Sequence, residues 1–152
     1  MKRLLLLTSF ILVSIITTSI QASAQQSYDT ACEKYKVYYS LEDALKDPLN
    51  VQRLDLSMQK ITVVPEQLMQ LKNLVCLDLA FNRMTSLPAS FTSLTKLEYL
   101  NLMGTRFFSK MPSILTKMPN LKLVDLRDHP EWSAATFADA VKQLPNVTVI
   151  IK

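Results

Sequence analysis

Carboxylates recur at equivalent places along this 152-residue chain. Asp55 and Asp78 each stand between two leucines, and Asp125 has a similar setting. Neighbouring parallel strands lie about 4.8 Å apart, which would bring Asp55 and Asp78 near the carboxylate separation of a retaining glycosidase. A flat sheet supplies no cleft, and calcium requires about six or more oxygen ligands in a shaped loop. We therefore interpret these aspartates as part of a structural repeat and predict no metal site.

Other candidates for catalysis are few. His129 is the single histidine and stands where other segments have a turn residue, so a structural hydrogen bond is the favoured interpretation. Gly104 is the single glycine, which excludes a glycine-rich phosphate-binding loop. No Ser-His-Asp set or general-base pair can be assembled. The sequence thus predicts no catalytic residues, no enzymatic activity and no cofactor.

The segments that hold these residues have the leucine spacing of short strands. Between Leu74 and Lys96 the apolar residues fall on the spacing L-x-x-L-x-L-x-x-N-x-L-x-x-L. The L-x-L unit has the two-residue period of a strand with both leucines on one face. Equivalent segments recur at nearly even spacing, and they start at Val51, Leu74, Leu97, Leu121 and Val147. One segment cannot bury its own leucines, so the segments must stack.

Prolines mark the return connections between the predicted strands. Pro65, Pro88 and Pro112 follow the turns and favour short helical or 3₁₀ segments, each with apolar residues three positions apart. The strand residues predicted to face the core in the second column are Leu54, Leu77, Leu100, Val124 and Ile150. Strands on one side and helical turns on the other predict an α/β fold.

The two ends of the array depart from the repeat, as ends that meet water do. Val37 to Tyr39 is β-prone, and Ser40 is a helix N-cap before a short helix. Ser133 caps a longer helix over 134–144, whose predicted inward residues are Phe137, Ala140, Val141 and Leu144.

Taken together, these residues resemble the leucine-rich repeat superfamily, in its 23-residue form with L-P after the turn. The resemblance covers about 51 to 152, and VYYSLEDALKDPLNVQRLDLS and LPNVTVIIK resemble the N-terminal cap and closing segment of exported bacterial members. It implies a right-handed leucine-rich repeat solenoid, with short parallel strands on the concave face and short helical or 3₁₀ segments on the convex face. The concave sheet of such solenoids usually binds proteins. The asparagine column reads Gln59, Asn82, Thr105 and His129, so the family's buried hydrogen-bond ladder should be partial.

Side chains beside the core leucines should point out of the sheet. Apolar residues among them are not required by the repeat, so either a partner contacts them or the preceding segment covers them. The candidate partner-binding residues are Arg53, Asp55, Met58, Asp78, Phe81, Tyr99, Asn101, Met103, Asp125 and Arg127.

The start of the chain, 1–24, has the three parts of a secretory signal peptide: Lys2 and Arg3, an apolar run, and Ala22-Ser23-Ala24. Serines and threonines interrupt the run, which is marginal for a bilayer span, so cleavage is favoured over a membrane anchor. We expect a signal peptide (1–24), a flexible lead-in (25–36), an N-terminal cap (37–50), four leucine-rich repeats (51–146) and a C-terminal closing strand (147–152). The mature protein should be secreted or periplasmic, without an integral membrane span.

Two cysteines, Cys32 and Cys76, remain after signal cleavage. Cysteines of exported proteins often pair, but a bridge requires Cα atoms within about 7 Å. The sequence leaves open whether these two pair or remain free thiols.

The predicted mature chain is nearly neutral, because removal of Lys2 and Arg3 leaves 15 cationic and 13 anionic residues. Such a chain lacks the large positive charge that attracts nucleic acids, so we do not predict nucleic-acid binding. The sequence therefore predicts an exported, non-catalytic module that binds a protein or peptide through its concave face. The alternative is a carbohydrate or cell-envelope glycan at the same face.

Overall fold

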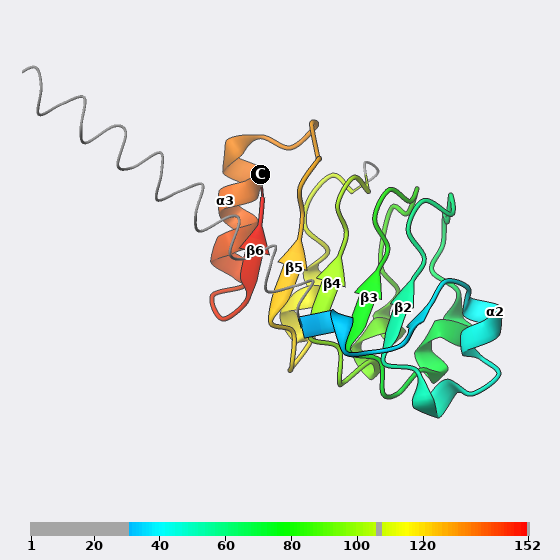
Figure 1. Ribbon diagram of the computed structural model, residues 1–152. Coiled ribbons are helices and arrows are strands. Elements are labelled where there is room, and N and C mark those ends of the chain that lie inside the picture. The colour runs from blue at the N-terminus through cyan, green and yellow to red at the C-terminus, as the bar shows by residue number, and fades with distance from the viewer. Residues whose placement is uncertain (1–30, 106–107, 152) are drawn as a thin grey trace, which may run out of the picture.

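The computed structural model describes residues 31–105 and 108–151. Its described strands form one parallel sheet in which chain order equals spatial order (Figure 1). The strands are β1 (Val37–Tyr38), β2 (Arg53–Asp55), β3 (Cys76–Asp78), β4 (Tyr99–Asn101), β5 (Leu123–Asp125) and β6 (Thr148–Ile150). Each step along the chain therefore adds one strand to the sheet, as expected for a solenoid.

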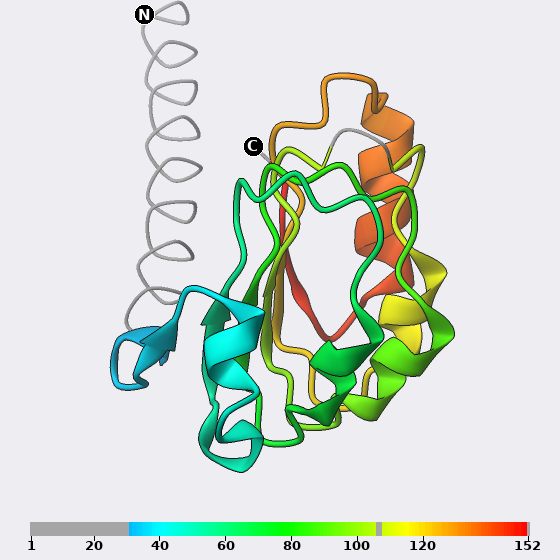
Figure 2. The ribbon, with the colours of Figure 1, turned by 90° about the vertical axis from the view of Figure 1, so that its right-hand side faces the viewer.

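Short helical segments form the opposite layer of the coil (Figure 2). Pro65, Pro88 and Pro112 each precede a 3₁₀ helix, as predicted, since proline fixes φ and lacks an N–H that would need a partner. These helices are Glu66–Gln70, Ala89–Ser93 and Ser113–Lys117, and a further 3₁₀ turn, Pro48–Asn50, belongs to the cap.

Among the described residues, two α-helices lie near the ends of the array, α2 (Leu41–Ala44) and α3 (Ala134–Gln143). Both begin after the predicted serine caps: Ser40 Oγ accepts from the N–H of Asp43, and Ser133 Oγ accepts from the N–H of Thr136, each at 3.1 Å. The N-terminal cap also supplies β1, whose Tyr38 is in register with Leu54 and packs against the core.

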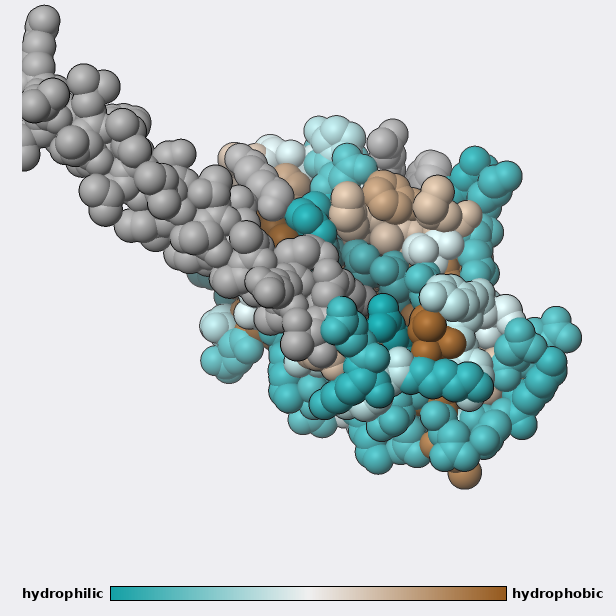
Figure 3. Space-filling model, in the orientation of Figure 1, coloured by the Kyte–Doolittle hydropathy of each residue, from teal (hydrophilic) through white to brown (hydrophobic). Residues whose placement is uncertain are grey.

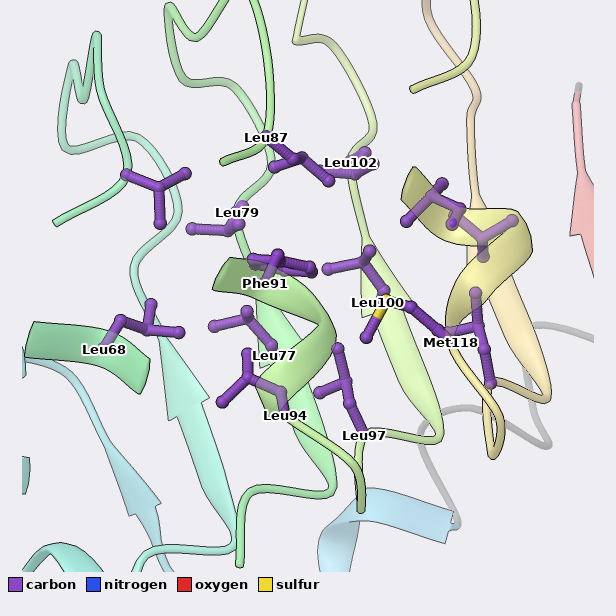
Figure 4. Close-up of a cluster of buried hydrophobic side chains, with 14 of the residues drawn as sticks. Leu68, Leu77, Leu79, Leu87, Phe91, Leu94, Leu97, Leu100, Leu102 and Met118 are labelled. Atoms are coloured by element: carbon purple, nitrogen blue, oxygen red, sulfur yellow. The ribbon is translucent and has the colours of Figure 1, made fainter. Parts of the chain in front are cut away.

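The core lies between the two layers and is built from the predicted leucine columns (Figure 4). Leu77 and Leu79 project from the second repeat and Leu100 and Leu102 from the third, and all four are fully buried. Phe91 and Leu94 meet them from the 3₁₀ helix opposite, so each turn closes its core only with help from its neighbours.

The register of the last strand differs from the prediction. Val149 is in register with Val124 and packs against the core, whereas Ile150 is in register with Asp125 and is buried outside the main core cluster. A shift of one residue reverses the faces of a strand, so Val149 takes the place in the second column that was predicted for Ile150, and Ile150 is buried on the other face of the strand.

The inward set of α3 also needs one correction. Ala140 and Leu144 are buried and Phe137 packs on the core, but Val141 is 44% exposed. The apolar stripe of this helix is therefore narrower than predicted, because the helix covers only the end of the array.

The predicted signal peptide lies outside the described residues. In the described ranges, no helix is long and apolar enough to span a bilayer.

Candidate partner-binding face

The concave face is the side of the sheet that points away from the core. Residues 31–36, predicted as part of a flexible lead-in, lie against the lower ends of the strands on this side (Figures 1 and 2). Cys32 and Cys76 form a disulfide with a Cα–Cα distance of 6.2 Å. Both cysteines are buried, in a small cluster with Val75 that is separate from the main core.

Two candidate residues contact this covering segment. The Nη1 atom of Arg53 donates to the carbonyl oxygen of Cys32 at 3.1 Å. Tyr99 and Tyr35 pack against the disulfide cluster. The lower part of the concave face is thus occupied by the protein's own chain.

The aspartate column has a structural role at the ends of the strands. In each repeat the side-chain oxygen accepts a hydrogen bond from the backbone N–H two positions later, which is an Asx turn. The distances are 2.9 Å for Asp55 and Ser57, 2.8 Å for Asp78 and Ala80, 3.0 Å for Asn101 and Met103, and 3.1 Å for Asp125 and Arg127. These hydrogen bonds form the turn in which the chain leaves the sheet after each strand. Asn101 makes the same hydrogen bond as the aspartates of the other repeats.

Charges along the column are compensated unequally. Arg127 holds Asp125, with Nη2 2.6 Å from Oδ2 and Nε 3.0 Å from Oδ1. Asp78 accepts instead from the neutral amide of Asn101 at 2.9 Å. Burial raises the pKa of Asp78, and the negative charges of Asp55 and Asp125 act in the same direction.

Three positions after each member of this column, the backbone enters the left-handed region. Met58, Phe81, Gly104 and Asp128 have φ values of 60°, 54°, 64° and 58°. Met58 is 73% exposed and Phe81 is 42% exposed. Figure 3 shows apolar surface near the upper ends of the strands, within a largely hydrophilic surround.

Phe81 lies over Gly104, the equivalent position of the next repeat. A Cβ at Gly104 would be 2.5 Å from Cδ1 and 2.6 Å from Cε1 of the Phe81 ring. The single glycine therefore makes room for an aromatic ring. This role of Gly104 was not predicted, although the sequence holds a signal for it: a phenylalanine and the only glycine stand at equivalent positions of successive repeats.

The turn column forms the partial ladder that was predicted. Buried Asn82 donates to the carbonyls of Leu56 (2.8 Å) and Leu79 (2.9 Å), and its Oδ1 accepts from the N–H of Ile61 at 2.9 Å. His129 is also buried, with Nε2 3.2 Å from the carbonyl oxygen of Leu102. Both side chains thus link neighbouring repeats.

The indole of Trp132 stacks on His129, with ring centroids 4.5 Å apart. The indole N–H also donates to the carbonyl oxygen of Phe108 at 2.6 Å. His129 therefore has a packed, hydrogen-bonded place in the fourth repeat. In the part of the chain that the structure describes, no three His, Cys, Asp or Glu side chains gather to hold a metal ion.

The structure thus divides the candidate residues. Asp55, Asp78 and Asn101 stand in register on three adjacent strands. Arg53 and Tyr99 contact the covering segment, and Asp125 and Arg127 pair with each other. We call the remaining candidates the concave strip: Asp55, Met58, Asp78, Phe81, Asn101 and Met103.

The stack of one strand and one 3₁₀ helix per turn defines a solenoid of short repeats. Residues 49–107 match the family model described as leucine rich repeat. The fold is therefore a leucine-rich repeat solenoid, and residues 49–107 carry the sequence pattern of the family. Domains of this class typically bind proteins and are generally non-catalytic scaffolds.

Solved structures with similar folds include two bacterial leucine-rich repeat proteins. One, from Leptospira interrogans, is 26% identical with a TM-score of 0.48, and the match covers 76% of this chain and 34% of that one. Another, from Bacteroides thetaiotaomicron, is 14% identical with a TM-score of 0.52, and the match covers 86% of this chain and 21% of that one. This chain thus spans about a third or less of either. No curated protein matches the sequence significantly.

Proposed function

We propose that this protein is an exported, non-catalytic module that binds a protein or peptide through the concave strip. The repeat class supports binding in general. The strip is the part of the candidate surface that neither residues 31–36 nor the Asp125–Arg127 pair occupies.

The observation that carries the proposal is the setting of Met58 and Phe81. Both are large apolar residues with exposed side chains, on backbone with positive φ. A left-handed conformation costs an L-residue about 1 to 2 kcal/mol. Gly104 shows that the repeat accepts glycine there. Burial of one such side chain by a partner would contribute about 1.5 to 3 kcal/mol. Binding would thus offset the cost of the left-handed backbone, which burial within the folded protein offsets only in part.

Export is supported by the disulfide as well as by the N-terminal pattern. Disulfides persist in oxidising compartments and are rare in the reducing cytosol. Cell fractionation and N-terminal sequencing test this part of the proposal. We expect an extracytoplasmic protein that begins at Gln25, and a cytoplasmic chain that retains Met1 would refute export.

Binding can be tested by crosslinking the mature protein in its cells and identifying the linked proteins by mass spectrometry. We expect the double variant Met58→Ala with Phe81→Ala to lose the specific crosslinks. Leu49 is an exposed apolar residue in the cap, with an exposed fraction between those of Met58 and Phe81, so Leu49→Ala is the matched control and should retain the crosslinks. Both variants must first show the wild-type circular dichroism spectrum. Unchanged crosslinks in the folded double variant would exclude the concave strip.

A further inference from the structure

We infer that the concave strip recognises a short extended peptide segment in which a basic side chain stands next to an apolar one. This inference rests on the proposed function and specifies the chemistry of the partner.

The size of the strip favours a short segment over a folded domain. Its residues come from β2, β3 and β4 and the turns above them. Strands about 4.8 Å apart, each contributing about four residues, cover roughly 10 by 13 Å. A standard protein complex buries about 800 Å² on each partner. A peptide segment with two or three anchoring side chains fits the smaller area.

The charge of the strip favours a cation. Asp55 and Asp78 are register partners on adjacent strands. Within the described ranges, neither forms an ion pair with a lysine or arginine. One oxygen of Asp55 is bonded to the N–H of Ser57, and no hydrogen bond to the described residues occupies the other. Two neighbouring carboxylates without a cation repel each other, and a basic side chain of a partner would relieve this repulsion.

The apolar residues stand beside the carboxylates in a repeated arrangement. Met58 follows Asp55 by three positions, and Phe81 follows Asp78 in the same way. Lysine and arginine have an apolar stem and a charged head, so they match a surface with an apolar side chain next to a carboxylate. The face of Phe81 also attracts cations.

The third repeat limits the footprint of the peptide. Its equivalent pair is Asn101 and Gly104, which provides neither a charge nor an apolar side chain. In the fourth repeat, Asp125 is already neutralised by Arg127. The paired arrangement of a carboxylate and an exposed apolar side chain is therefore found in the first two repeats.

Labelled heptapeptides test the inference by fluorescence anisotropy with the mature protein. The probes are glycine-serine peptides with Lys-Leu-Lys, Gln-Leu-Gln, Glu-Leu-Glu or Lys-Gly-Lys at the centre. We expect Lys-Leu-Lys to bind about three- to tenfold more tightly than Gln-Leu-Gln, and the other two more weakly still. The lysine preference should vanish between about 50 mM and about 500 mM salt, since exposed charges are screened.

The double variant Asp55→Asn with Asp78→Asn isolates the charge. Asparagine preserves the Asx turn, as Asn101 does in the next repeat, so the fold should persist and a thermal melt checks it. This variant should bind Lys-Leu-Lys and Gln-Leu-Gln equally. Asp139→Asn on α3, remote from the strip, removes a charge elsewhere and should leave the lysine preference unchanged.

Several results would overturn the inference. A lysine preference that survives in the double variant would place the cation elsewhere. Equal binding of all four probes, abolished by Phe81→Ala, would refute the basic requirement but leave the proposed function standing. Absence of binding by every probe would also overturn the inference, and the crosslinking experiment would then decide the proposed function separately.

Discussion

Replacement of Gly104 by alanine tests the geometry of the concave strip most directly. Gly104 has a φ of +64°, and an added Cβ would lie 2.5 Å from the nearest atom of the Phe81 ring. Carbon atoms pack at about 3.5 to 4.0 Å, so the ring or the backbone must move by about 1 Å. The substitution therefore introduces two separable effects, one from the backbone and one from the ring.

The expected cost follows from these two effects. Left-handed backbone costs alanine about 1 to 2 kcal/mol more than glycine. Overpacking in a closed core adds about 1 to 3 kcal/mol, but Phe81 is 42% exposed and can swing outward, so we expect the lower end. Gly104→Ala should thus destabilise the protein by about 2 to 3 kcal/mol. In a Phe81→Ala background only the backbone cost remains.

Urea unfolding of four proteins measures both effects: wild type, Gly104→Ala, Phe81→Ala and the double variant. The single tryptophan, Trp132, is buried and gives a fluorescence signal, and circular dichroism should give the same midpoint. We expect a coupling energy of about 1 kcal/mol between the two sites. Additive effects within about 0.3 kcal/mol would refute the contact between the ring and Gly104.

Three further predictions concern stability. Asn82→Ala should destabilise the protein by about 2 to 4 kcal/mol in urea unfolding, because it leaves buried backbone groups of two repeats without partners. Cys32→Ser with Cys76→Ser should cost about 2 to 4 kcal/mol in the same assay, because the bridge closes a loop with a sequence separation of 44. Asp78→Asn should reduce the decrease of stability with rising pH, because burial raises the pKa of Asp78 and ionisation therefore opposes folding, while the loss of the hydrogen bond from Asn101 lowers stability at every pH.

The pH dependence of the last prediction has a definite sign. The folded state binds the Asp78 proton more tightly than the unfolded state, whose pKa is near the ordinary value of 3.8. Stability from this group is therefore greatest below that value and falls as pH rises through the folded pKa. Denaturant unfolding from acid to neutral pH should show that Asp78→Asn lacks this decrease. A variant whose stability depends on pH in the same way as that of the wild type would contradict the argument.

The predictions for Asn82→Ala and for the double serine variant each have a matched control. Exposed Gln59→Ala, in the same column as Asn82, should cost less than about 0.5 kcal/mol, and an equally mild effect of Asn82→Ala would disprove the ladder. Reductant should lower the stability of the wild type but not of the double serine variant. A reductant effect on both would show that the disulfide is not its cause.

The sequence predicted the repeating part of the fold because its signals are local. The two-residue period of L-x-L placed Leu77 and Leu79 on one face, and Pro88 marked the start of a 3₁₀ helix. The register of β6 could not be predicted with the same security, because the final connection is longer and carries no such marker. One residue more or less in that connection decides whether Val149 or Ile150 faces the core.

The concave face was less predictable because its exposure depends on distant contacts. Nothing near Tyr99 in the sequence reveals that residues 31–36 pack there, and the Cys32–Cys76 bridge joins segments with a separation of 44. The exposure of Phe81 was predictable from its place in the turn beyond the core leucines, where the repeat requires no apolar residue. Its position over Gly104 was not, because the ring reaches into the next repeat.

The partial ladder in the turn column has a consequence for how the array opens. Asn82 joins the first repeat to the second, and His129 joins the third to the fourth, whereas in the described ranges the hydroxyl of Thr105 donates to Leu102 of its own repeat. In a quasi-one-dimensional array, the weakest interface determines where cooperative unfolding divides. The boundary between the second and third repeats lacks this link of the turn column and is joined by the Asn101–Asp78 hydrogen bond instead, so we expect two foldons, one with the first two repeats and one with the last two.

The ring of Phe81 crosses the boundary between these foldons to reach Gly104. A ligand seated on that ring and on Met103 would contact both halves of the molecule. Binding would then slow hydrogen exchange in both foldons together, so a ligand on one small surface would stabilise the whole array.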